Sequence, residues 1–168
     1  MGIWNKMFGK RRAIARYSEA GLRFTEEEAS FVKKHQSFYS KEPDGSNNIV
    51  TEKGGNAIIS QGLRYYAEHL IEEAEKQPSD ARSCELLDKA IRASMKAYAF
   101  HNLPIQLCNI AGMLEMAGNN EEAKRFYGLF LQEWYSFKPD VVDEIFQKEI
   151  NIDTDMAIVR AKNRIADL

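Results

Sequence analysis

The stretch from Leu103 to Pro139, LPIQLCNIAGMLEMAGNNEEAKRFYGLFLQEWYSFKP, constrains the fold more than any other part of the chain. Its apolar residues recur at steps of three and four on both sides of Gly118, which is typical of two amphipathic helices. Gly118 stands where a helix end requires a left-handed backbone. Apolar residues wrap over half of the second helix, which must therefore contact at least two neighbours. These residues are Ala123, Phe126, Tyr127, Phe130, Leu131, Trp134 and Phe137. We expect a tight antiparallel hairpin within a larger stack.

The remaining sequence predicts further helices and no convincing strand. Thr25 and Glu28 have the spacing of a capping box and begin the first of these helices. Helices, six or seven in all, are predicted over about 25–39, 56–77, 79–101, 104–118, 120–138, 141–148 and 154–166. Residues 40–55 are polar and rich in turn residues, so we expect a loop there. The expected fold is all-α: antiparallel hairpins stacked in a single domain over 23–168, with no sheet, following a basic tail over 1–22.

Composition places the chain among ordinary globular proteins. Its 168 residues are 44% hydrophobic and 29% charged, enough to bury a core without metal or disulfide support. Cys84 and Cys108 both fall inside predicted helices and resemble no disulfide framework. No apolar run approaches the roughly 20 residues that span a bilayer, and the first residues lack the apolar centre of a signal peptide. We therefore expect a cytoplasmic protein with free thiols.

Charge is distributed unevenly along the chain. The first 16 residues carry five basic side chains and no acidic one, which leaves 18 basic against 25 acidic residues in the remainder. A nucleic-acid backbone is bound by clustered basic side chains, so the helical body is not expected to bind nucleic acid.

The basic tail also contains aromatic residues, and several roles stay open for it. Aromatic and basic side chains without acids suit the surface of an anionic membrane. The same side chains could instead pack on the acidic helical body, remain disordered, or bind another partner. The residues concerned are Trp4, Lys6, Phe8, Lys10, Arg11 and Arg12.

The hairpin around Gly118 resembles the tetratricopeptide repeat, a helix pair of about 34 residues. Aligned on Gly118, the small residue of the family's first helix falls on Ala111, and its large residues fall on Leu107 and Leu114. The second-helix positions fall on Ala123, Tyr127 and Phe130. The closing proline, Pro139, comes about four residues late. Residues 62–97 resemble a second, degenerate repeat with irregular spacing.

This resemblance implies a concave groove lined by the first helix of each repeat, which binds a peptide or a partner helix. On the better repeat the groove positions would be Ile105, Cys108, Asn109, Gly112, Glu115 and Met116. Asn109 matches an asparagine that holds a peptide backbone in many family members, but the family's accompanying basic residues are missing. The groove is expected to be apolar and mildly acidic.

No catalytic, nucleotide or metal motif accompanies these helices, and no cofactor is expected. The leading hypothesis is a protein-interaction module, either an adaptor or a chaperone-like holder for a protein or peptide partner. The alternative is a peripheral membrane or assembly factor anchored by the tail. An enzyme on a helical bundle is the third hypothesis, and would need a polar occluded pocket. Self-association through Trp134 and Tyr135 stays open.

Overall fold

The computed structural model describes residues 24–39, 52–77, 80–150 and 153–168, and these residues form seven helices and no strand. The predicted all-α class is confirmed. The helices are α3 (Glu26–Tyr39), α4 (Glu52–Glu75), α5 (Asp80–Phe100), α6 (Pro104–Met116), α7 (Asn120–Ser136), α8 (Val141–Glu149) and α9 (Thr154–Asp167). The aromatic and basic residues of the predicted tail lie outside the described residues.

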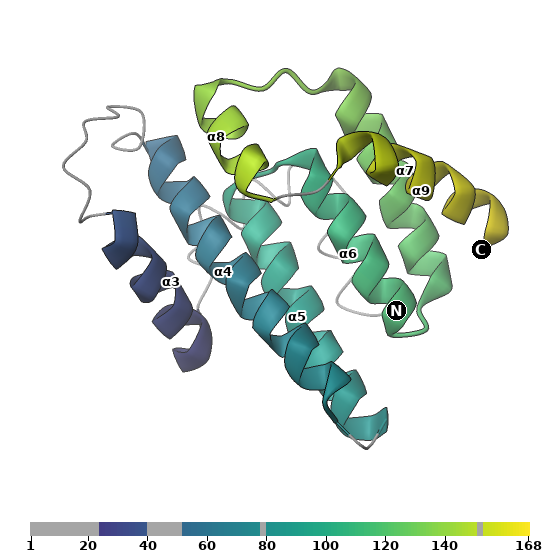
Figure 1. Cartoon of the computed structure of the whole chain (residues 1–168), viewed down its shortest axis with the longest axis horizontal. Helices are drawn as coiled ribbons and strands as arrows, with labels where there is room; N and C mark the ends of the chain where they lie inside the picture. The colour runs from purple at the N-terminus through teal and green to yellow at the C-terminus, as the bar shows by residue number, and fades with distance from the viewer. Residues whose placement is uncertain (1–23, 40–51, 78–79, 151–152) are drawn as a thin grey trace.

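Two antiparallel hairpins form the centre of the fold (Figure 1). Helices α4 and α5 make the first hairpin and α6 and α7 the second, and the hairpins meet where α5 contacts α6. Helix α3 packs on α4, and α8 contacts the same helix near its beginning. Helix α9 crosses the second hairpin, packing mainly on α7 and also touching α6.

Small residues at the helix contacts allow the hairpins to pack closely. Ala90, Ala93, Ala111 and Ala123 are fully buried, so two helix backbones can approach each other at these positions. Large buried side chains fill the remaining space in the core: Leu107, Ile110, Leu114, Phe126, Tyr127 and Phe130. The alternation of small and large residues in the sequence therefore becomes a dense core between helices.

Two of the predicted helix ends have the expected geometry. The Thr25 amide donates to Glu28 at 2.8 Å and the Glu28 amide donates to Thr25 at 3.2 Å, which completes the predicted capping box. Gly118 has a φ of +74°. Its amide donates to Glu115 and the Asn119 amide donates to Leu114, both at 2.8 Å. This is the Schellman arrangement, which satisfies the last carbonyls of α6.

The predicted loop over 40–55 is wrong at its end, because α4 begins at Glu52 rather than Asn56. The extra turn is anchored by Lys53, whose ammonium donates to Asp140 at 2.5 Å and to Asp143 at 2.8 Å. These partners lie almost 90 residues away in sequence, at the start of α8. A contact between such distant segments leaves no signal in the local pattern that predicted the loop.

Asp143 links three parts of the fold in a buried position. Its other oxygen lies 2.8 Å from the ring Nε2 of His101, and both side chains are buried. Burial lowers the pKa of His101, although the hydrogen bond and charge of Asp143 oppose this shift. A neutral His101 therefore donates to the Asp143 carboxylate and, with Lys53, joins α8 to the first hairpin.

Replacing the left-handed Gly118 should destabilise the second hairpin. An alanine Cβ would meet no atom within 4 Å at Gly118, so the expected cost of Gly118→Ala, about 1–2 kcal/mol, comes from the positive φ alone. Gly128→Ala in α7 also meets open space but has helical backbone, so it should stabilise the protein by roughly 0.5–1 kcal/mol. Urea denaturation measures both; equal effects of the two substitutions would contradict the assigned backbone conformation.

Removing the buried carboxylate of Asp143 should cost far more than removing a surface carboxylate. Asp143→Ala leaves the buried His101 ring without its acceptor and leaves Lys53 with Asp140 alone, and the expected loss in unfolding free energy is about 2–3 kcal/mol. Asp88, which pairs with Arg92 on the surface of α5, supplies the control. Asp88→Ala should cost at most about 1 kcal/mol in the same denaturation experiment. A similar cost for both variants would mean that the Asp143 cluster does not hold α8.

Candidate functional site

A pocket of about 490 Å³ lies between α4, α6 and α9, with one residue contributed by α5. Volumes of this size are usual for ligand sites. Helix α6 supplies Gln106, Cys108, Asn109, Gly112, Met113 and Met116. Helix α4 supplies Arg64, Ala67, Glu68 and Ile71, α5 supplies Ser94, and α9 supplies Met156, Ala157 and Arg160 together with its N-cap residue Asp153. Helix α6 therefore runs between walls formed by the other two long helices.

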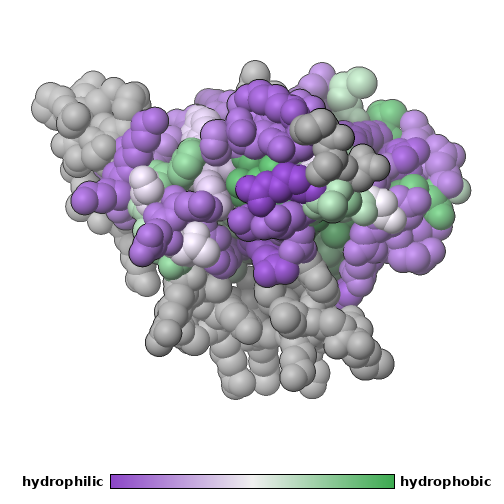
Figure 2. Space-filling model, turned by 90° about the horizontal axis from the view of Figure 1, so that it is seen from below, coloured by the Kyte–Doolittle hydropathy of each residue, from purple (hydrophilic) through white to green (hydrophobic). Residues whose placement is uncertain are grey.

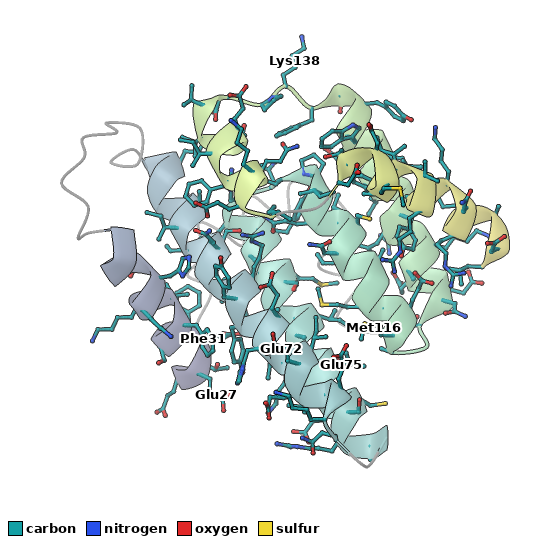
Figure 3. All side chains as sticks on the ribbon, viewed as in Figure 1. Glu27, Phe31, Glu72, Glu75, Met116 and Lys138 are labelled. Carbon is teal, nitrogen blue, oxygen red and sulfur yellow. The ribbon has the colours of Figure 1, made fainter. Side chains whose placement is uncertain are left out.

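Four of the six predicted groove residues line this pocket: Cys108, Asn109, Gly112 and Met116. The other two lie elsewhere. Ile105 is 2% exposed and belongs to the hydrophobic core, so it presents no surface to a partner. Glu115 is turned toward α7 and α9, where it contacts Tyr127 and Arg164. Figure 3 locates Met116 at the C-terminal end of α6.

The charges at the pocket are balanced rather than acidic. Arg64 and Glu68 come from the α4 wall, and Arg160 and Asp153 come from the α9 wall. The sequence-based expectation of a mildly acidic groove is therefore wrong for the pocket. It failed because it counted only the α6 positions, and left out Arg64 on α4 and Arg160 on α9.

Gln106 is a pocket residue that sequence reasoning missed. It is 3% exposed, and its Nε2 donates to the carbonyl of His101 at 2.9 Å and to the hydroxyl of Ser60 at 3.3 Å. The positions of Nε2 and Oε1 cannot be exchanged. Oε1 would then face the carbonyl oxygen of His101, and both atoms only accept hydrogen bonds. No donor among the described residues reaches Oε1. The sequence does carry a signal for this residue, because a glutamine stands between Ile105 and Leu107 in an otherwise apolar helix.

Glu115 holds α9 beside the pocket. Its carboxylate accepts hydrogen bonds from the Tyr127 hydroxyl and from Arg164, whose Nε lies 2.6 Å away, and Arg160 lies 3.5 Å away. Burial alone would raise the pKa of Glu115, but the bonds from Arg164 and Tyr127 and the two positive charges outweigh it and lower the pKa. The ionised carboxylate thus connects α6, α7 and α9.

The thiol of Cys108 is expected to be unreactive. Burial raises its pKa to about 11, although the charge of Arg160 opposes the shift. The thiol is therefore protonated near neutral pH, and a protonated thiol is a poor nucleophile and metal ligand. Cys84 lies exposed on α5, and neither cysteine forms a disulfide. In the described part of the chain, no three His, Cys, Asp or Glu side chains gather as a metal site requires.

A second hollow lies between α3, α4 and α5, near Glu27 and Phe31 (Figure 3). Its main groups already contact each other. The Tyr66 hydroxyl donates to Glu27 at 2.5 Å, and the Phe31 ring packs on the Tyr66 ring with centroids 5.2 Å apart. These contacts attach α3 to α4, so we assign this region a structural role.

Comparisons of the chain with protein-family models, curated proteins and solved structures find no significant match. Within the described ranges, none of the helices combines the length and apolar character that a membrane span requires. What the described residues define is an all-α protein of packed hairpins, with a pocket between its first hairpin, its second hairpin and its last helix.

Releasing α9 should expose the Cys108 thiol. In the unmodified chain we expect iodoacetamide to alkylate Cys84 quickly and Cys108 at least roughly 100-fold more slowly, because of burial and the raised pKa. The double substitution Arg160→Gln and Arg164→Gln removes both cations from Glu115 and should raise the Cys108 rate about tenfold or more. Mass spectrometry of the alkylated peptides measures both rates.

Lys162→Gln, at an exposed position on the same helix, is the control. If it raised the Cys108 rate as much as the double substitution, the arginines would not be what secures α9.

Proposed function

We propose that this protein is a non-catalytic interaction module, an adaptor or chaperone-like holder, that binds a segment of a partner protein in the pocket between α4, α6 and α9. The observation that carries the proposal is the pocket itself, whose apolar lining is open to a ligand. An unreactive buried thiol offers little to a reaction mechanism, whereas a recess with apolar and charged side chains suits recognition.

Exposed methionines at the pocket support binding to protein rather than to a small polar molecule. Met116 on α6 is 50% exposed and Met156 on α9 is 65% exposed, and both line the pocket. Methionine is enriched in protein interfaces, and its unbranched side chain adapts to different partners. Exposed apolar side chains that flank a recess are typical of interaction surfaces.

The face of the molecule shown in Figure 2 offers no broad apolar area among the described residues. On the face shown in Figure 2, most side chains are hydrophilic and the hydrophobic ones occupy small separate areas. Helix α9 also lies against part of α6, since Arg160 approaches within 3.3 Å of the place where a Cβ on Gly112 would lie. A partner would therefore enter the recess beside α9 with a few side chains.

The arrangement also supports our proposal of a tetratricopeptide-like site. Helices α4 and α6 are the first helices of the two hairpins, and in that family the first helices line the binding groove. Both contribute to the pocket. Helix α9 is the additional element, because it forms a third wall and shortens the available surface.

A selection of random linear peptides on the immobilised full chain tests this proposal. Peptides enriched on the unmodified protein should be lost when Met116→Glu and Met156→Glu are introduced together, because two carboxylates at the pocket would oppose apolar side chains. We expect individual selected peptides to lose at least about tenfold in affinity, measured by isothermal titration calorimetry.

Val159→Glu provides the matched control for this selection. Val159 lies on α9, as Met156 does, and is 52% exposed, but it does not line the pocket. The control variant should retain the selected peptides. Failure to enrich any peptide, or equal loss with the control variant, would contradict a partner-binding role for the pocket.

A further inference from the structure

We propose that the pocket is a receptor for an indole side chain, so that the partner's anchoring residue is a tryptophan whose N–H donates to Oε1 of Gln106. This inference rests on the proposed function and specifies the occupant of the same site. Its first basis is Gln106, a buried side chain that lines the pocket and whose carbonyl oxygen no donor among the described residues reaches.

Oε1 of Gln106 determines which chemical group a ligand must carry. A buried acceptor that gains a hydrogen bond recovers part of the free energy of its desolvation. Because the His101 carbonyl and the Ser60 hydroxyl fix the Nε2 side of Gln106, only Oε1 is left to recognise a ligand, and the ligand has to donate. The indole N–H is a donor with no acceptor beside it, whereas an amide or a hydroxyl brings lone pairs that would need partners of their own.

The pocket walls suit an aromatic ring. Ala67, Gly112 and Ala157 come from three different helices and provide small, flat surfaces. Three methionines line the same recess, and thioether sulfur makes favourable contacts with aromatic rings. They are Met113, Met116 and Met156. A tryptophan ring can therefore fill the recess. Because Oε1 of Gln106 is itself buried, lining side chains must shift as the ring enters for its N–H to reach this atom.

Two guanidinium groups at the recess also favour indole over other rings. Arg64 and Arg160 line opposite walls of the pocket. A guanidinium interacts with the face of an aromatic ring, and tryptophan gives the strongest interaction of this kind. Phenylalanine would fill the volume but offer no donor, so it should bind more weakly than tryptophan.

Three blocked amino acids serve as probes in a nuclear magnetic resonance titration of the full chain. N-acetyl-tryptophanamide should shift the signals of Gly112 and of the Gln106 side-chain amide, with a Kd on the order of 1 mM. The 1-methylindole analogue, which cannot donate, should bind at least about fivefold more weakly, and so should N-acetyl-phenylalaninamide. Gln106→Met should bind the tryptophan probe and its methylated analogue equally, because the acceptor is gone.

The comparison of probes on the unmodified chain decides the inference even if Gln106→Met does not fold. Equal binding of the three probes, or shifts confined to residues outside the pocket, would overturn the indole assignment. The peptide selection separates this failure from failure of the proposed function. Pocket-dependent peptides without tryptophan would overturn the indole anchor and leave the partner-binding role standing, whereas the absence of any pocket-dependent peptide would overturn both.

Discussion

The contact between Glu115 and Arg164 determines what the rest of the structure can do. Helix α9 lies over the second hairpin as a separate element, and its charged attachment to α6 passes through this carboxylate, with Arg160 nearby and the Tyr127 hydroxyl on the α7 side. With α9 in place, the surface between the two hairpins becomes a three-walled pocket. Without it, α6 would present only an open face, and three residues of α9 and its N-cap Asp153 would be lost from the lining.

Helix α9 is held in two ways, by this charged contact and by apolar burial, since Ala161 is fully buried and Ala157 is 5% exposed. The hairpins depend on complete burial of alanines and aromatic side chains, which is hard to reverse locally. The arginines of α9 are 57% and 39% exposed, so water and salt weaken their pairing with Glu115. The charged part of the α9 attachment is therefore the part that salt weakens, whereas the burial of Ala157 and Ala161 keeps the helix docked.

Sequence reasoning was accurate where structure depends on near neighbours. The capping box at Thr25, the left-handed turn at Gly118 and the order of helices all follow from spacing within one or two turns. It failed where distant segments meet. The first turn of α4 depends on Asp140 and Asp143, and the lining of the pocket depends on α4 and α9 lying beside α6. Gln106 could be assigned to the pocket only once the helices around it were known.

The position of α9 relative to the first hairpin is the most direct test of the whole account. Spin labels can be attached through Glu72→Cys on α4 and Lys162→Cys on α9, both exposed positions, in a Cys84→Ser background where Cys108 stays buried. Pulsed electron paramagnetic resonance then measures the distribution of distances between the labels. We expect a single narrow distribution, because α9 has one docked position. A broad distribution would mean that α9 forms no stable wall, and the pocket would not exist in solution.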